Sequence, residues 1–124
     1  MNIKIIQYNE AAKFAKGEKS IFLNKQYIYF GLYDKETLLS ILSISEKNDV
    51  VMFHSNFTPL PLRGKGYFTA LLSAVSKTYK DKIQMANCLE SSKNIYLKLG
   101  FELKNIRHYT NHNLYKVVKR NGKR

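Results

Sequence analysis

The sequence predicts a single domain of the α+β class over residues 1–124, with a mostly antiparallel sheet and flanking helices. Its 124 residues suit one compact domain. Its 44% hydrophobic and 24% charged residues are ordinary for a globular protein and exclude a disordered chain. Apolar residues follow strand patterns in the first half and helical spacing after residue 66, so strands come first and helices alternate with strands later.

The first half contains four predicted strands and one short helix. Ile3–Tyr8 is a β-prone opening, and Asn9 is expected to cap a helix over Glu10–Lys16 because its side chain accepts from free first-turn amides. The short polar turns between the next three strands predict antiparallel hairpins. These strands are expected over residues 27–33, 37–45 and 50–58. The leucines of residues 37–45 also fit a helix.

The second half adds helices on either side of one further strand. From Gly66 the apolar residues fall on one helical stripe: Phe68, Leu71, Leu72, Val75 and Tyr79. A strand over residues 83–89, parallel to the strand before the helix, would complete a strand–helix–strand crossover. Ser91 and Ser92 are expected caps of a helix that Gly100 ends. A hairpin over residues 101–109 and 114–118 finishes the chain.

Net charge is the unusual feature of the composition. Twenty-one Lys and Arg oppose nine Asp and Glu, a formal charge of +12. Residues 1–62 carry seven Lys and six acids, or +1, whereas residues 63–124 carry ten Lys, four Arg and three acids, or +11. The imbalance predicts an anionic partner: nucleic acid, a membrane or a phosphorylated small molecule. The scarcity of Arg weakens base-specific reading of nucleic acid.

Cysteine use and the apolar segments favour a cytoplasmic protein without a membrane span. Cys88 is the one cysteine, so no internal disulfide forms and the residue is expected to be buried filler; an acyl-cysteine role is the alternative. The N-terminus lacks the apolar core of a signal peptide. The longest uncharged stretch, residues 50–62, is too short to cross a bilayer.

The segment Arg63–Thr69 predicts a phosphate-binding loop. Gly64 and Gly66 allow a tight turn and close approach of the backbone to a ligand. The amides that follow open a helix, whose N-terminal end attracts anions, and Arg63 and Lys65 add positive charge. A Walker loop is excluded because no Gly-Lys-Ser/Thr run occurs, and a dinucleotide fingerprint because Thr69 replaces the third glycine. A glycine-bearing tight turn without a ligand is the alternative.

Two motifs resemble those of the GNAT superfamily of acyl-CoA-dependent N-acetyltransferases. Arg63–Phe68 is similar to the pattern R/Q-x-x-G-x-G/A, with Phe68 in place of the last small residue. Ser91–Glu102 is similar to a later helix of the family, whose usual Asn is replaced by Leu89. The residues that match this second motif are Ser92, Tyr96, Gly100 and Phe101.

The resemblance implies a GNAT-like fold, a site for acetyl-CoA and no metal. The pantetheine arm would bond to backbone groups at the end of the strand that precedes the loop, and the pyrophosphate would lie on the loop amides. A backbone amide near that strand end would stabilise the oxyanion, and Tyr96 would protonate the leaving thiolate. The implied cofactor-binding residues are Phe57, Thr58, Arg63, Gly64, Lys65, Gly66, Tyr67, Phe68, Thr69 and Ser92.

The general base is chosen from the residues. His54 lies on the strand before the loop and has an intrinsic pKa suited to base work, which makes it the candidate. A structural role for His54 and a base role for Glu90 are the alternatives. His108 and His112 lie four residues apart, but no acid or cysteine joins them at ligand spacing, so a hairpin tip is their simpler place.

The resulting functional hypothesis is direct transfer of an acetyl group from acetyl-CoA to a primary amine. The amine would be carried by a small molecule, a protein or an aminoacyl-tRNA. A small basic nucleic-acid-binding domain and a CoA-binding relative without catalysis are the rival hypotheses. Only residues 9–26 separate the first two strands, where the family usually has two helices. This predicts an open acceptor side, or one completed by a second subunit in a homodimer.

Overall fold

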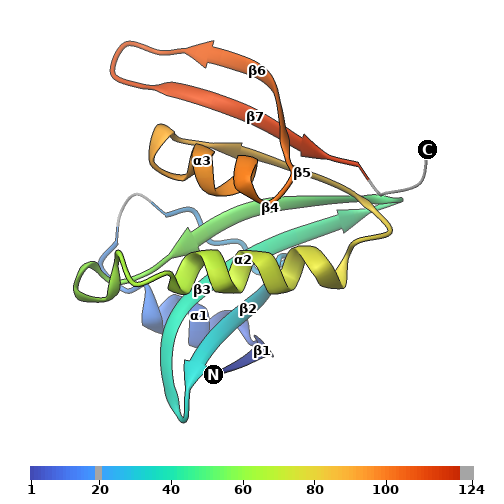
Figure 1. Ribbon diagram of the computed structural model, residues 1–124. Helices are drawn as coiled ribbons and strands as arrows, with labels where there is room; N and C mark the ends of the chain where they lie inside the picture. The colour runs from blue at the N-terminus through green and yellow to red at the C-terminus, as the bar shows by residue number, and fades with distance from the viewer. Residues whose placement is uncertain (19–20, 121–124) are drawn as a thin grey trace. The chain divides into compact units, whose positions relative to one another are not determined.

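A computed structural model describes residues 1–18 and 21–120 (Figure 1). In these residues strands and helices follow the predicted order, with a short 3-10 helix added before the second α-helix. The elements are β1 (Asn2–Ile6), α1 (Tyr8–Phe14), β2 (Ile28–Asp34), β3 (Thr37–Lys47), β4 (Val50–Phe57), η1 (Leu60–Leu62), α2 (Tyr67–Thr78), β5 (Ile83–Cys88), α3 (Glu90–Lys98), β6 (Glu102–His108) and β7 (Asn113–Lys119).

The strands of the described residues pair in the order β1-β2-β3-β4-β5-β7-β6. β1 with β2, β2 with β3, β5 with β7 and β6 with β7 are antiparallel pairs. β4 and β5 are parallel, with Val50 opposite Ile83 and Phe53 opposite Ala86. The α+β class and the single parallel crossover around α2 are therefore confirmed.

Both helix caps expected from side chains are wrong. α1 begins at Tyr8 after Gln7, and α3 begins at Glu90 after Leu89, and neither of these preceding residues caps with its side chain. Asn9 lies inside its helix, so its side chain cannot take the capping position. Ser91 and Ser92 likewise lie inside α3. In both helices the first helical residue lies one or two positions before the residue expected to cap it. At the other end of α3, Gly100 has φ +97° and ends the helix as predicted.

The chain divides into two compact units, of which the first holds residues 1–45 and 54–78. Its strand β2 is contacted by both α1 and α2. Tyr29, Tyr33 and Ile41 form one buried cluster with Ala11 of α1. By the two-residue alternation of strands, Phe30 and its pair Leu42 face the other side of the sheet. There α2 supplies the buried side chains Leu71, Leu72 and Val75.

The second unit holds residues 46–53 and 79–124, in whose described part α3 contacts β5, β6 and β7. Tyr96 of α3 lies edge-on to Phe53 and Phe101, at ring-centroid distances of 6.3 and 5.1 Å. Offset and edge-on aromatic pairs add to the stability gained from burial alone. This aromatic cluster, with Cys88 and Val117 also buried, is the core of the unit.

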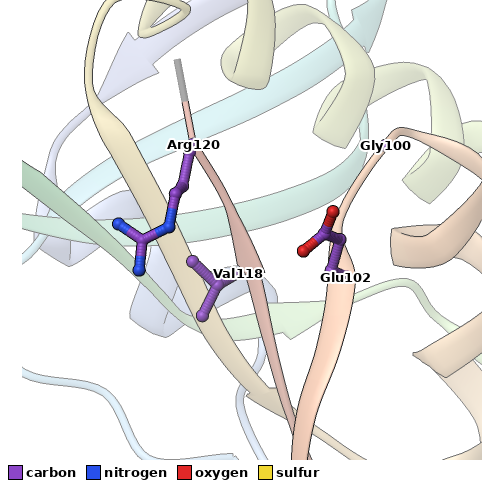
Figure 2. A pocket seen from close by; sticks show the side chains of 4 residues that line it. All are labelled: Gly100, Glu102, Val118 and Arg120. Atoms are coloured by element: carbon purple, nitrogen blue, oxygen red, sulfur yellow. The ribbon is translucent and has the colours of Figure 1, made fainter. Parts of the chain in front are cut away.

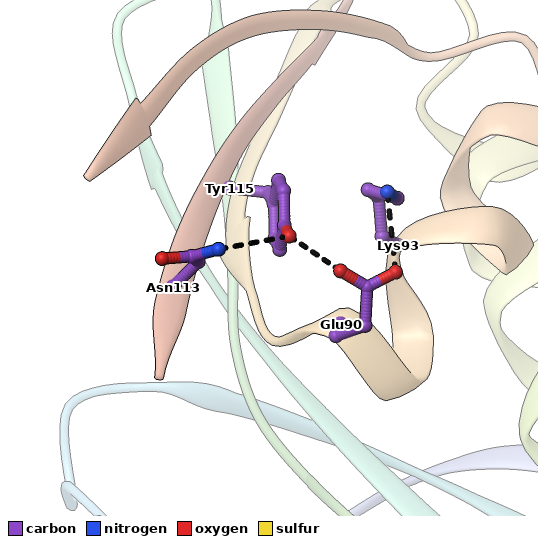
Figure 3. A network of polar contacts seen from close by, with 4 residues as sticks. All are labelled: Glu90, Lys93, Asn113 and Tyr115. Carbon is purple, nitrogen blue, oxygen red and sulfur yellow. Dashed lines mark hydrogen bonds and ion pairs between the residues drawn. The ribbon is translucent and has the colours of Figure 1, made fainter. Parts of the chain in front are cut away.

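A chain of polar contacts ties the start of α3 to β7 (Figure 3). The Tyr115 hydroxyl donates to the Glu90 carboxylate, which also pairs with Lys93 at 3.2 Å. Asn113 Nδ2 lies 3.4 Å from the Tyr115 hydroxyl, and its Oδ1 lies 2.9 Å from His108 Nδ1. The hydrogen bond from Tyr115, followed by the one from Lys93, lowers the pKa of Glu90.

We expect Tyr115→Phe to lower the melting temperature more at about pH 7 than at about pH 3. Because the pKa of Glu90 is lowered in the folded state, its carboxylate adds stability above the ordinary value of 4.5. That contribution is lost as the pH falls through the folded pKa. Circular dichroism melts at the two pH values measure the difference. Tyr109→Phe, at an exposed residue, is the control, and an equal loss at both pH values would contradict the role of Glu90.

Candidate functional site

The predicted phosphate loop is a left-handed turn at the start of α2. Gly64 has φ +79° and Gly66 has φ +84°, a region that L side chains rarely adopt. A Cβ atom at either position would meet nothing within 4 Å, so glycine is required by the backbone conformation and not by crowding. Ala70 N–H donates the first helical bond, to Gly66 O at 3.0 Å. Helix geometry therefore leaves the earlier amides of Tyr67 and Thr69 without an intrahelical acceptor.

Arg63 joins this loop to the end of β4. Its Nε donates to Thr58 O at 2.7 Å, and its guanidinium carbon lies 6.0 Å from the centroid of the Phe57 ring. The structure therefore brings together three of the residues expected to bind the cofactor. The sequence indicates only the charge of Arg63, and its hydrogen bond back to Thr58 is a property of the folded chain.

The loop has the chemistry of an anion site. Arg63, Gly64, Lys65 and Gly66 are all exposed, and Tyr67 and Phe68 are half-buried. The sequence contains no carboxylate between Asp49 and Asp81, so no acid of this segment opposes a bound anion. Free amides at a helix start together with nearby cations favour phosphate. The residues present therefore fit the pyrophosphate of coenzyme A.

Three serines of β3 fix the second half of β4, a feature that sequence analysis missed. Ser40 Oγ lies 2.8 Å from Thr58 Oγ1. Ser43 Oγ accepts from Ser55 N–H at 2.9 Å and donates to Ser55 O at 3.0 Å. Ser40 and Ser43 are fully buried, and the available signal was three serines placed within an otherwise apolar strand. Because Ser55 N–H already donates to Ser43 Oγ, this amide is not available to stabilise an oxyanion.

His54 is held on two sides within the first unit. Its Nε2 lies 2.7 Å from Ser45 Oγ, the third of these serines. Its ring stacks on Tyr27, with centroids 3.9 Å apart and planes 6° from parallel. Partial burial lowers the pKa of His54, because desolvation disfavours the charged imidazolium. The imidazole is therefore neutral and oriented near neutral pH, as a base requires.

Tyr96 lies in the core of the second unit, with only 2% of its surface exposed. Burial raises the pKa of its phenol, and the nearby Cys88 thiol raises it further. The hydroxyl is therefore protonated at neutral pH. Because the side chain is buried, any group that accepts its phenolic proton has to reach into the packed interior of the unit.

Cys88, Glu90 and Ser92 are the other residues that the sequence offers for the site. Burial raises the pKa of the Cys88 thiol to about 11, so little thiolate exists near neutral pH to accept an acyl group. Glu90 already accepts from Tyr115 and Lys93, and its lowered pKa makes it a weak base. Ser92, an expected cofactor contact, is half-buried in the first turn of α3 and donates its amide to Leu89 O at 3.1 Å.

The two histidines near the last turn take part in local contacts. His108 is bonded to Asn113, and His112 stacks on Tyr109 with centroids 5.0 Å apart. Within residues 1–18 and 21–120, no three His, Cys, Asp or Glu side chains gather as they would around a metal ion. In the same residues no helix has the length and apolar character needed to span a membrane.

Comparison with known proteins gives matches in structure and not in sequence. No family model matches the chain, and no curated protein matches it. The chain is similar to the ribosomal-protein-S18-alanine N-acetyltransferase of Escherichia coli, with a TM-score of 0.78 at 14% identity over 95% of this chain and 92% of that one.

Two further solved structures resemble this chain over nearly its full length. An acetyltransferase of the GNAT family from Streptococcus pneumoniae has a TM-score of 0.74 at 12% identity, over 98% of this chain and 99% of that one. A Bacillus subtilis acetyltransferase in complex with CoA has a TM-score of 0.70 at 12% identity, over 96% and 97%. With the strand order and the crossover around α2, these likenesses show that this chain has the fold of the GNAT family of N-acetyltransferases.

Proposed function

We propose that this chain, as one domain over residues 1–124, is an acyl-CoA-dependent N-acetyltransferase. It would transfer an acetyl group from acetyl-CoA directly to a primary amine. The observation that carries the proposal is the left-handed turn at Gly64 and Gly66, which opens α2 in a chain with the GNAT fold. That turn precedes a helix N-terminus, whose backbone donors would bind a CoA pyrophosphate.

The residues that would hold acetyl-CoA come from the loop and the end of β4. Backbone groups of Phe57 and Thr58 would bind the pantetheine arm in the manner of an added strand. Ser92 would contact the cofactor from α3. Acetyl-CoA supplies an activated thioester to the reaction. The loop residues that would contact the pyrophosphate are Arg63, Gly64, Lys65, Gly66, Tyr67, Phe68 and Thr69.

His54 and Tyr96 would handle the protons. An amine must lose a proton before it attacks a thioester, and the neutral, stacked imidazole of His54 can take it. Tyr96 would donate its phenolic proton to the leaving sulfur, and its raised pKa keeps that proton in place until then. The high pKa of Cys88 favours direct transfer over an acyl-cysteine intermediate.

Gly66→Asp is expected to weaken binding of acetyl-CoA by about tenfold or more. A carboxylate beside the pyrophosphate adds a repulsion of about 1 kcal/mol or more even in water. Isothermal titration calorimetry measures the affinity. Gly17→Asp is the matched control, because Gly17 is also left-handed at φ +87° with open space around it. Unchanged affinity in Gly66→Asp, or an equal loss in Gly17→Asp, would refute the phosphate loop.

Tyr96→Phe should reduce turnover by about 10²–10⁴-fold, the usual effect of removing a general acid. The change keeps the ring and its edge-on contacts, so affinity for acetyl-CoA should stay within about twofold. A mass-spectrometric screen of amines supplies the acceptor, and release of CoA then measures turnover. Tyr115→Phe, which removes another buried hydroxyl of the same unit, serves as control. Full turnover by Tyr96→Phe would remove the residue from the mechanism.

His54→Gln should abolish the acidic limb of the pH–rate profile. The wild-type kcat/KM should rise with pH through the pKa of His54, which lies below its ordinary value of 6.5, because the neutral imidazole is the active form. A variant with the same limb as the wild type would exclude His54 as the base.

Binding of acetyl-CoA without turnover over the whole amine panel would instead identify a non-catalytic CoA-binding protein.

A further inference from the structure

One face of the sheet in the second unit points away from α3. On β7, Tyr115 and Val117 are buried, whereas Lys116 between them is exposed. Strand residues alternate between faces, so Lys116 lies on the face opposite to the one that carries these buried side chains. The register places Asn87 of β5 and Asn105 of β6 on either side of Lys116, and both are exposed. We call this surface the outer face; its polar and charged residues are Asn87, Glu102, Asn105, Arg107, Lys116 and Arg120.

The outer face is cationic. Arg107, Lys116 and Arg120 are exposed, and none of them has an ion-pair partner among the residues that the structure describes. Glu102 is the one acid of the face, and Lys104 binds its carboxylate at 3.0 Å. Arg107 and Lys116 therefore carry positive charge without a salt bridge in the described residues, and Arg120 does so although it lines the same pocket as Glu102. Such a surface attracts an anionic partner with several charges.

The two ends of the face differ in shape and chemistry. At one end a small pocket is lined by Gly100, Glu102, Val118 and Arg120, and Figure 2 shows the Glu102 and Arg120 side chains on either side of Val118. At the other end, beyond β6 and β7, the rings of Tyr109 and His112 stack at the hairpin tip. Tyr109 is 49% exposed, so its ring is accessible to a ligand.

We propose that the outer face and the hairpin tip bind single-stranded nucleic acid without reading its sequence. Cations along a sheet would contact phosphates, and the exposed aromatic rings of the tip would stack on a base. The amides of Asn87 and Asn105 add hydrogen-bond donors and acceptors beside Lys116. An acidic peptide would engage the cations but would gain nothing from the stacked rings. This proposal does not depend on the transferase activity and involves neither the loop nor His54.

Fluorescence anisotropy with the full chain and 12-nucleotide oligo(U) and oligo(dT) tests the proposal. With about three phosphate contacts, the logarithm of affinity should fall with the logarithm of salt at a slope of about −2, a loss of about 16-fold between 50 and 200 mM salt. The oligonucleotide that binds more tightly identifies RNA or DNA as the preferred strand. A 12-residue poly-glutamate peptide and a blunt duplex are the competing ligands, and both should bind at least about tenfold more weakly.

Two variants separate the charge from the stacking. Arg107→Glu/Lys116→Glu should lower affinity about tenfold or more and make the salt slope shallower by about 1.4. Tyr109→Ala should lower affinity about fivefold or more at an unchanged slope, because stacking is not ionic. Lys16→Glu/Lys35→Glu changes the net charge equally at exposed residues of the first unit and should bind as the wild type does. Melting curves establish that each variant is folded.

Three results would overturn the proposal. Equal losses in the two charge-reversal variants would mean that net charge, and not this face, attracts the ligand. Equal affinity for the peptide would identify a general polyanion surface. Unchanged binding by both Arg107→Glu/Lys116→Glu and Tyr109→Ala would place any nucleic-acid site elsewhere. None of these results bears on acetyl-CoA binding at Gly66, so the two proposals can fail separately.

Discussion

The hydrogen bonds from the β3 serines to the end of β4 are the constraint on which the candidate site depends. Ser43 occupies both backbone groups of Ser55, and Ser40 holds the Thr58 hydroxyl. Buried hydroxyls that each have a partner cost little, whereas a lost partner would leave a desolvated polar group. The strand end is thereby fixed, and Arg63 transmits its position to the loop through Thr58 O. Ser45 extends the same arrangement to His54.

The proton-handling candidates show how burial sets opposite properties in two side chains. Desolvation disfavours the charged form of each group. It therefore lowers the pKa of His54, whose charged form is the acid, and raises that of Tyr96, whose charged form is the base. Near neutral pH the first side chain is therefore unprotonated, and the second retains its proton. A single physical effect would thus provide both partners that amine acetylation needs.

Much of the fold was predictable because its signals are local. Aromatic and β-branched residues predicted β2, short polar turns delimited β3 and β4 as strands, and helical spacing after Gly66 predicted α2. The helix starts were not predictable from capping preference. Glu90 and not a serine opens α3, and its carboxylate bonds to Tyr115. This contact joins residues far apart in the sequence, so no local rule could anticipate it.

The sequence by itself determined the glycine turn of the phosphate loop, the stripe of α2 and the charge excess that begins at Arg63. These follow from the conformational freedom of glycine, from the helical repeat and from counting, all of which are properties of neighbouring residues. Only the tertiary structure decided that Ser45 and Tyr27 hold His54, that Tyr96 is buried and that Lys116 lies on an exposed face. Burial and partner choice depend on segments brought together from distant parts of the chain, and the free energy of a side chain is set by those neighbours.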